Sequence, residues 1–292
     1  MSDKIGPFSV VAHLGEGAHS SIMHIRRNGD GRQFALKIVK IEDDEAIKFL
    51  EQAEHEFAVA QKLDHPNLIK IYALEKIKSF GIFGGKVKEV RQLIEFVNGK
   101  TLDNFKIIPL GILLQIFRDV AAGLVMMHRR NVCHGDLKPN NIMLSKSGNV
   151  KIIDYGLSWI KGQDKQRIQG TPEYMAPEQV KKVVNEKTDI FNFGATMYRL
   201  LTWHYVPQCI AAPGQNSMPI DEDTWKRSFK PVLERNPKCP KSLAKLVEHC
   251  LAFRAVYRPE TMSEVHDDLE AMVTKYVKAE DDQLANWEWA AS

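Results

Sequence analysis

The 292-residue sequence is poor in cysteine and contains no long uninterrupted apolar run. Its four cysteines, Cys133, Cys209, Cys239 and Cys250, form no C-x-x-C pair. We therefore expect buried thiols in a reducing, cytoplasmic setting rather than a disulfide or zinc framework. Because neither a run of about eighteen apolar residues nor a basic-then-apolar leader occurs, we predict no membrane span and no secretory signal. The net charge of +3 is too small to indicate nucleic acid or a membrane surface as a partner.

The most informative stretch runs from His134 to Asp154. It reads H-G-D-L-K-P-N-N-I-M-L and, after a turn, ends in I-I-D-Y-G. A hairpin here would bring Asn141 and Asp154 side by side, where both could bind one hard cation through oxygen ligands. Asp136, an acid that can accept a hydroxyl proton, and Lys138, an amine for phosphate charge, complete a set that suits phosphoryl transfer. The competing interpretation is ordinary turn chemistry, which Asp, Asn and Gly in a loop usually indicate.

The same stretch strongly resembles the catalytic loop and the metal loop of the eukaryotic-type (Hanks-type) protein kinases, H-R-D-x-x-x-x-N followed by D-F-G. Two positions depart from that pattern, because Gly135 stands in place of the arginine and Tyr155 in place of the phenylalanine. The resemblance implies an ATP-dependent phosphotransferase in which Asn141 and Asp154 hold Mg²⁺, with Mn²⁺ as a substitute.

Three strands are predicted near the N-terminus, over residues 8–14, 22–25 and 33–40. Gly15 and Gly17 lie between the first two strands and by themselves indicate only a hairpin turn. Together with Lys37 on the third strand they resemble the kinase glycine-rich loop and its strand-three lysine, although Ser20 replaces the third glycine. The resemblance implies that loop N–H groups approach the phosphates and that Lys37 neutralises their charge. The alternative is a solvated strand lysine.

Residues 41–63 are predicted as one long helix with an acidic first turn. Glu56 falls on the same face as Ala53 and Ala60, so an acid is set in an apolar stripe and needs a partner. By resemblance it is the glutamate that pairs with Lys37. The alternative, in which Glu56 reaches solvent, is less favoured.

Two further strands are predicted over residues 68–77 and 90–96, and the connector at 78–89 as a mobile surface loop without a catalytic role. The segment that follows resembles the hinge between kinase lobes. The match implies an adenine site with Ile94 at its back and with backbone groups of Glu95 and Val97 on the purine edge. The apolar residues implied to sandwich the adenine are Leu14, Ile22, Ala35 and Met143. Taken alone, each of these is better explained as core.

Residues 170–178, G-T-P-E-Y-M-A-P-E, closely resemble the end of a Ser/Thr kinase activation segment. In that family the lysine at Lys138 lies near the γ-phosphate and the substrate hydroxyl, whose proton Asp136 would accept. Thr171, together with Lys138, implies Ser/Thr rather than Tyr specificity.

Phosphorylation of the central activation loop is not expected to control activity. Between Asp154 and Thr171 only Ser158 carries an aliphatic hydroxyl. Gly135 cannot pair with a phosphate, as the arginine of the family does at that position.

The remaining third is predicted as mostly helical. Residues 110–130 form a strongly apolar stretch that indicates a central buried helix. By resemblance, Asp189 anchors the backbone of the catalytic loop, and Arg258 pairs with Glu178. The run Thr261 to Glu264 predicts a capping box that opens the last helix.

We therefore predict an α+β chain with the two-lobed protein-kinase fold. Residues 1–97 would form a small N-lobe, an antiparallel sheet with one long helix. Residues 98–276 would form a larger, mainly helical C-lobe, with ATP between the lobes. The acidic tail at 277–292 carries Trp287 and Trp289, for which docking on the domain is favoured over docking on a partner.

The predicted function is transfer of the γ-phosphoryl of Mg-ATP to a Ser or Thr hydroxyl of a protein substrate, and the motif set resembles bacterial members of the family. Two other classes stay open. A pseudokinase scaffold usually lacks one of the catalytic residues, all of which are present here. Small-molecule kinases lack the segment that matches residues 170–178.

Overall fold

The computed structural model describes residues 4–17, 19–43, 46–79, 85–162, 168–210 and 219–276. The chain divides into two compact units. Unit 1 comprises Met1–Asp64, Leu68–Asn98 and Asp154–Gly156, and unit 2 comprises His65–Asn67, Gly99–Ile153 and Leu157–Ser292. The tail predicted at 277–292, with Trp287 and Trp289, lies outside the described residues.

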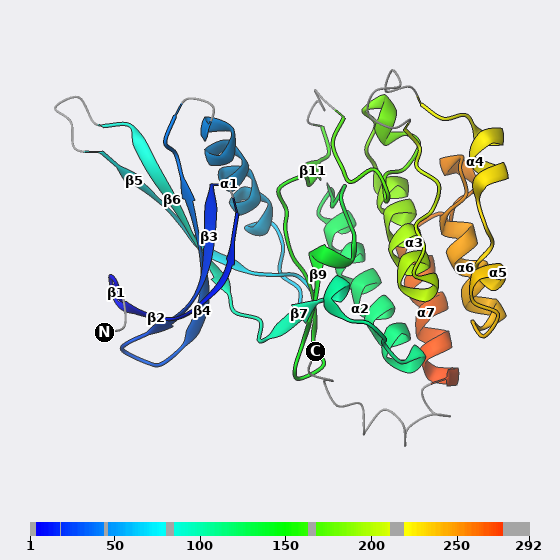
Figure 1. The fold of residues 1–292 in the computed structure, drawn as a ribbon, viewed down its shortest axis with the longest axis horizontal. Helices are drawn as coiled ribbons and strands as arrows, with labels where there is room; N and C mark the ends of the chain where they lie inside the picture. The colour runs from blue at the N-terminus through cyan, green and yellow to red at the C-terminus, as the bar shows by residue number, and fades with distance from the viewer. Residues whose placement is uncertain are drawn as a thin grey trace. The chain divides into compact units, whose positions relative to one another are not determined.

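Unit 1 is built on a six-stranded antiparallel sheet with the strand order β1-β2-β3-β4-β6-β5 (Figure 1). Its strands are β1 Lys4–Ile5, β2 Phe8–Glu16, β3 Ser20–Arg27, β4 Gln33–Lys40, β5 Ile71–Lys78 and β6 Val87–Glu95. The predicted connector at 78–89 is shorter than expected, because the β5–β6 ladder continues to the pair Lys78 and Val87. β5 is an edge strand, so its polar side chains can face solvent while its backbone stays paired. Residues 80–84 of this connector lie outside the described residues.

The alternation of side chains along the strands creates two apolar clusters, one on each face of the sheet. One face buries Ile25, Phe34, Leu36 and Ile38. On the opposite face, Val39 and Val90 pack against Ala53 of helix α1, Ile47–Ala60. Because Lys37 is two residues from Val39 on β4, it lies on the same face as α1.

Helix α1 begins at Ile47 and not at residue 41, so the predicted start was wrong. The carboxylate of Asp43 accepts a hydrogen bond from Ala46 N at 2.8 Å. A side chain that binds the backbone in this way holds the chain in a turn before the helix starts. The prediction of an acidic first turn was also wrong, because the first turn from Ile47 carries no acid. Residues 44–45 are not among those described.

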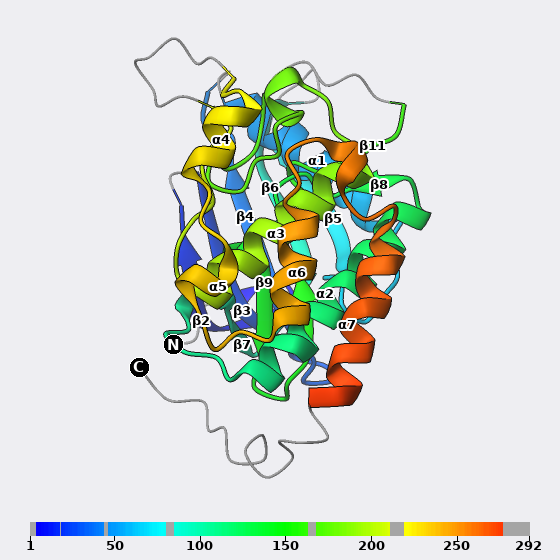
Figure 2. The same ribbon diagram turned by 90° about the vertical axis from the view of Figure 1, so that its right-hand side faces the viewer.

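Unit 2 is mainly helical (Figure 2). Its α-helices are α2 Leu110–Arg129, α3 Glu186–Thr202, α4 Glu222–Ser228, α5 Val232–Arg235, α6 Lys241–Cys250 and α7 Met262–Tyr276. α7 packs along α2, and α6 packs along α3. The predicted cap of α7 is half confirmed: Thr261 Oγ1 accepts from Glu264 N at 3.3 Å, whereas the Glu264 carboxylate accepts from Glu260 N at 2.8 Å.

Short strands and 3₁₀ helices connect the helices of unit 2. The strands are β7 Gly99–Thr101, β8 Val132–Cys133, β9 Ile142–Ser145, β10 Val150–Ile152 and β11 Trp159–Ile160, and the 3₁₀ helices are η2 Leu102–Asn104, η3 Pro139–Asn141, η4 Gln179–Lys181 and η5 Ala255–Tyr257. β9 and β10 form the hairpin predicted between Asn141 and Asp154. Gly148, with φ at +83°, makes its turn, a conformation that glycine adopts without strain.

Within the described ranges, α2 is the one helix long and apolar enough to cross a membrane. The sequence analysis predicted a central buried helix over residues 110–130, and α2 confirms that prediction. Its Leu114, Phe117, Val120 and Leu124 are buried inside unit 2. A central core helix meets the same criteria, so the apolar character of α2 is explained by packing.

Candidate active site

In unit 1 the structure brings the predicted Lys37 and Glu56 together. Lys37 Nζ lies 2.8 Å from Glu56 Oε2 and 3.1 Å from Oε1. Glu56 is 3% exposed and shares a buried helix face with Ala53 and Ala60, so the predicted stripe is confirmed. The pair satisfies a carboxylate that would otherwise be buried without a partner.

Strand register aligns the glycine-rich segment with this lysine. Gly15 pairs with Ile22 across β2 and β3, and Ile22 pairs with Lys37 across β3 and β4. Opposed residues of an antiparallel pair project from the same face, so Ile22 and Lys37 share a face. Gly17 N donates to Ser20 O at 2.7 Å and closes the tip of the turn.

A cavity of about 250 Å³ opens beside the ion pair, within unit 1. Its lining includes Lys37, Glu56, His19 and Ser20. The His19 ring stacks on Phe49 of α1 with centroids 4.7 Å apart, which ties the tip of the glycine-rich segment to the helix. The cavity thus places the Lys37–Glu56 ion pair beside His19 and Ser20, at the end of the glycine-rich segment.

The structure places the residues predicted for adenine without testing their roles. Ala35 pairs with Ile94 across β4 and β6, so both lie on the face that bears Lys37. Glu95 N donates to Lys70 O at 2.8 Å, which commits that N–H to the protein. Leu14 is 49% exposed on β2. Val97 follows β6 in unit 1, and Met143 lies on β9 of unit 2; their roles stay predictions.

In unit 2 the predicted catalytic residues form a closed triangle. Lys138 Nζ donates to Asp136 Oδ2 at 2.8 Å and to Thr171 Oγ1 at 2.7 Å. Thr171 N donates to the second carboxylate oxygen of Asp136, also at 2.8 Å. Asp136 is 7% exposed. An acid, an amine and a hydroxyl are therefore oriented by one another and by the backbone.

Asn141, in unit 2, and Asp154, in unit 1, each carry a side-chain oxygen of a type that can bind a cation. Asn141 Nδ2 donates to Asp136 O at 2.9 Å, so the amide nitrogen is held by the protein and the oxygen remains as the ligand atom. Asp154, in unit 1, has φ at +70°, and its Oδ1 accepts from Gly156 N at 2.9 Å. An amide oxygen and a carboxylate fit the hard-oxygen preference of Mg²⁺.

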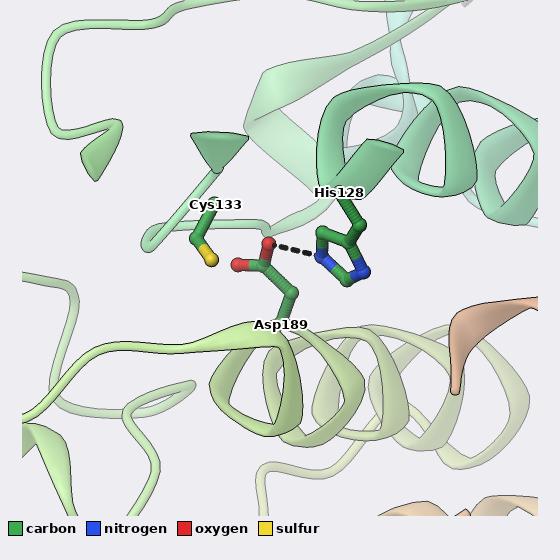
Figure 3. Close-up of side chains that lie close together, drawn as sticks. All are labelled: His128, Cys133 and Asp189. Carbon is green, nitrogen blue, oxygen red and sulfur yellow. Dashed lines mark hydrogen bonds and ion pairs between the residues drawn. The ribbon is translucent and has the colours of Figure 1, made fainter. Parts of the chain in front are cut away.

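The aspartate predicted as an anchor, Asp189, is completely buried and binds the catalytic loop. Its Oδ2 accepts from His134 N and its Oδ1 from Gly135 N, both at 2.8 Å. His128 Nε2 also lies 2.8 Å from Oδ2 (Figure 3). Burial by itself would raise the pKa of Asp189, but the hydrogen bond and charge of His128, with the Gly135 N–H, hold that pKa below its ordinary value.

Figure 3 also places the Cys133 thiol beside this carboxylate. The donor atoms of His128, Cys133 and Asp189 lie within 4.8 Å of one another, as in a metal site. Both carboxylate oxygens, however, already accept backbone hydrogen bonds. We therefore interpret the cluster as the anchor of the catalytic loop.

A second buried ion pair supports the end of residues 170–178. Arg258 binds both oxygens of Glu178, at 2.7 and 2.9 Å. Its guanidinium also donates to the carbonyls of Lys187, Ala252 and Phe253. The predicted pairing of Arg258 with Glu178 is confirmed, and charge-assisted bidentate contacts of this kind are the stronger class of hydrogen bond.

Sequence reasoning missed three polar side chains near these groups, of which Gln92 and Gln179 are buried and His128 is partly buried. Gln92 Nε2 donates to Ala53 O of α1 at 3.0 Å, Gln179 Nε2 donates to Gly135 O at 2.8 Å, and His128 contacts Asp189. A polar residue inside an apolar run is the available signal, and it applies to Gln92 and His128. Gln179 carried no such signal.

Comparison with known proteins extends these observations. The family model described as "Protein kinase domain" matches residues 8–269. A carbon catabolite-derepressing protein kinase of Candida tropicalis is 27% identical over 277 residues, which cover 92% of this chain and 41% of that protein. An Aurora kinase of Eremothecium gossypii is 28% identical, covering 88% of this chain and 66% of its own length. Mitogen-activated protein kinase kinase 2 of Arabidopsis thaliana is 29% identical, covering 77% and 59%. The chain thus spans between about two fifths and two thirds of these relatives.

Proposed function

This chain belongs to the protein kinase family, and on that premise we propose that it transfers the γ-phosphoryl of ATP to Ser or Thr hydroxyls of a protein substrate. The single observation that carries the proposal is the triangle of Asp136, Lys138 and Thr171. It supplies an acceptor for the hydroxyl proton beside an amine for the charge on the phosphoryl group. The named relatives are protein kinases, which supports the same reaction class.

Each residue has a separate task in this proposal. Lys37, held by Glu56, neutralises phosphate charge of the nucleotide. Asp136 orients the substrate hydroxyl and accepts its proton, while Lys138 offsets charge on the transferring group. Asn141 and Asp154 would hold Mg²⁺, which would supply positive charge against the phosphate groups of the nucleotide. Catalysis is then mostly positioning and electrostatics.

We also propose that phosphorylation of the central activation loop is not required. Gly135 offers no side chain to receive a phosphate, and Ser158 is 5% exposed. Residues 163–167 of the loop lie outside the described residues and contain no Ser or Thr. Enzyme treated with phosphatase should keep its activity. A loss of most activity, with the lost phosphate mapped to this loop by mass spectrometry, would contradict the proposal.

A reducing, cytoplasmic setting is proposed from the cysteines. All four are buried. Burial raises the pKa of Cys209 to about 12 and that of Cys239 to about 11, which keeps these thiols protonated and unreactive near neutral pH.

The decisive test is transfer of labelled γ-phosphate from Mg-ATP to a generic basic protein, comparing wild type with Asp136→Asn. Removing the base should lower kcat by roughly 10²- to 10⁴-fold while ATP binding, followed by calorimetry, is retained. Equal transfer by both proteins would remove Asp136 from the mechanism. Absence of transfer by wild type, with ATP still bound, would favour a scaffold.

A further inference from the structure

We infer that Gln179 is a positioning residue that joins the catalytic loop to the end of the activation segment through neutral hydrogen bonds, in place of a phosphate. The inference rests on the proposed kinase activity and concerns how its catalytic residues are held in place. Gln179 is 1% exposed and opens the 3₁₀ helix η4, directly after Glu178. Its side-chain amide contacts parts of unit 2 that are far apart in sequence.

The Gln179 amide uses its full hydrogen-bonding capacity. Its Nε2 donates to Gly135 O at 2.8 Å and to Gln169 O at 3.5 Å. Its Oε1 accepts from Ala176 N at 2.8 Å and from Asn192 Nδ2 at 2.9 Å. An amide has two donor hydrogens and two acceptor sites, so this buried side chain has no unused polar capacity.

The orientation of the amide follows from its partners. A carbonyl can only accept and a backbone N–H can only donate. The nitrogen of Gln179 must therefore face Gly135 O, and its oxygen must face Ala176 N. Asn192, on α3, supports the same arrangement, because its Nδ2 also donates to Tyr174 O at 2.6 Å. The network thus joins the catalytic loop, residues 169–176 and α3.

Both connections lead to Asp136. On one side, the peptide groups around Gly135 are held twice, because Gly135 N donates to Asp189 and Gly135 O accepts from Gln179. On the other side, Thr171 N donates to Asp136 Oδ1 at 2.8 Å. A shift of Gln179 would therefore disturb the carboxylate from both directions.

Gly170 makes room for this contact. A Cβ at Gly170 would lie 3.2 Å from Gln179 Nε2 and 3.0 Å from Met175 Cγ, and φ at Gly170 is +130°. Both observations favour glycine next to Thr171. The backbone therefore passes close to the Gln179 amide without a side chain between them.

The contacts of Gln179 carry no net charge. Its partners are three backbone groups at Gly135, Gln169 and Ala176 and the amide of Asn192, none of which titrates. Among the flanking residues in sequence, Asp136 is held by Lys138 and Thr171, and Glu178 is paired with Arg258. A phosphate is not needed to hold a connection made in this way.

Gln179→Leu tests the inference, because leucine has a similar size and cannot form these hydrogen bonds. We expect kcat for protein substrate to fall by about 10- to 100-fold, since small misplacements of catalytic groups have effects of this size, while the ATP dissociation constant changes less than about twofold. Asn236→Leu is the matched control. Its Nδ2 donates to Leu201 O at 2.8 Å near the far end of α3, and its loss should change kcat less than about twofold. Equal kcat for both variants would overturn the inference.

Gln179→Glu separates positioning from a general loss of stability. As a carboxylate, the new side chain would face Gly135 O without a donor, and burial favours its protonated form. Once protonated, it can donate to Gly135 O and accept from Ala176 N. The ratio of wild-type to variant kcat should therefore shrink at least about threefold as pH falls from about 8.5 to about 6. A ratio independent of pH, or one that grows, would contradict the inference.

The controls distinguish this inference from the proposed function. If wild type transfers no phosphate, the proposed function fails before Gln179 is tested. If wild type, treated with phosphatase, is active and Gln179→Leu is equally active with an unchanged melting temperature, only the role of Gln179 fails. Loss of kcat in folded Gln179→Leu, with ATP still bound, is the expected result.

Discussion

The two compact units hold their charged side chains in different ways. In unit 1, Lys37 and Glu56 bind each other, and their side chains are 24% and 4% exposed. Their meeting depends on strand register and on the packing of α1. In unit 2, Asp189 and Arg258 bind backbone groups as well as a charged or polar partner. Substituting Lys37 should therefore affect activity more than folding, and substituting Asp189 or Arg258 should affect both.

The largest effect on stability is expected from Asp189→Ala. Its loss leaves His134 N, Gly135 N and His128 without their buried acceptor. We expect the free energy of unfolding in urea to fall by about 3–5 kcal/mol. Asp119→Ala is the control, because Asp119 pairs with Arg118 at a partly exposed position and should cost under about 1 kcal/mol. If both variants lose a similar free energy of unfolding, the contrast drawn between the two units is wrong.

The same carboxylate predicts a dependence of stability on pH. Since the folded-state pKa of Asp189 is lowered, its ionised form stabilises the protein above the unfolded pKa of about 3.9. This stabilisation is lost as pH falls through the folded pKa. The stability difference between wild type and Asp189→Asn should narrow as pH falls below about 4. A stability difference that grows as pH falls would contradict the predicted direction.

Lys37→Met tests the contrasting behaviour of unit 1. It leaves Glu56 buried without its partner, but the partial exposure of the site limits the cost to about 2 kcal/mol. Activity should fall by about 10²- to 10³-fold, because a charge that faces the phosphates is lost. Phosphoryl transfer and thermal melting would be measured together. If Lys37→Met lowers the melting temperature but the molecules that stay folded keep their activity, the distinction drawn between the two units is wrong.

A smaller effect is expected from Gly135→Ala. Gly135 has φ at +75°, where a side chain costs about 1–2 kcal/mol. Because its backbone is fixed by Asp189 and Gln179, the strain cannot be relieved by a turn of the chain. Urea unfolding should show a loss of about 1 kcal/mol, with no new dependence on phosphatase treatment. An unchanged free energy of unfolding would show that the backbone at Gly135 is less constrained than the backbone in other parts of unit 2.

The smallest effect, and a stabilising one, is expected from Lys182→Gly. Lys182 is exposed at the end of η4 with φ at +62°, a conformation that glycine adopts more readily than lysine. The melting temperature should rise by an amount equivalent to about 0.5 kcal/mol in the free energy of unfolding, and kcat should not change. A lower melting temperature would indicate that the lysine side chain contributes to unit 2.

Local patterns in the sequence predicted much of the fold and of the site. Strand β4 and the hairpin of β9 and β10 follow from alternation and turn residues, which act over a few positions. The stripe around Glu56 follows from helix periodicity, which also places this acid where it needs a partner. The triangle at Asp136 was implied by a motif whose members are close in sequence, apart from Thr171.

Contacts between residues far apart in sequence could not be predicted in the same way. The start of α1 depends on which backbone group Asp43 binds. The side chain of Gln179 reaches Gly135 across 44 positions of the chain, and His128 reaches Asp189 across 61. The adenine-site roles all remain predictions; they concern Leu14, Ile22, Ala35, Ile94, Glu95, Val97 and Met143.

By itself, the sequence determined which side chains are chemically capable of the reaction and which faces of the strands and helices are apolar. It could do so because residue type, turn chemistry and periodicity are local properties. Only the tertiary structure decided which buried polar groups share a hydrogen bond. In a water-excluded interior each donor and acceptor must find a partner, and that choice depends on the position of the whole surrounding backbone.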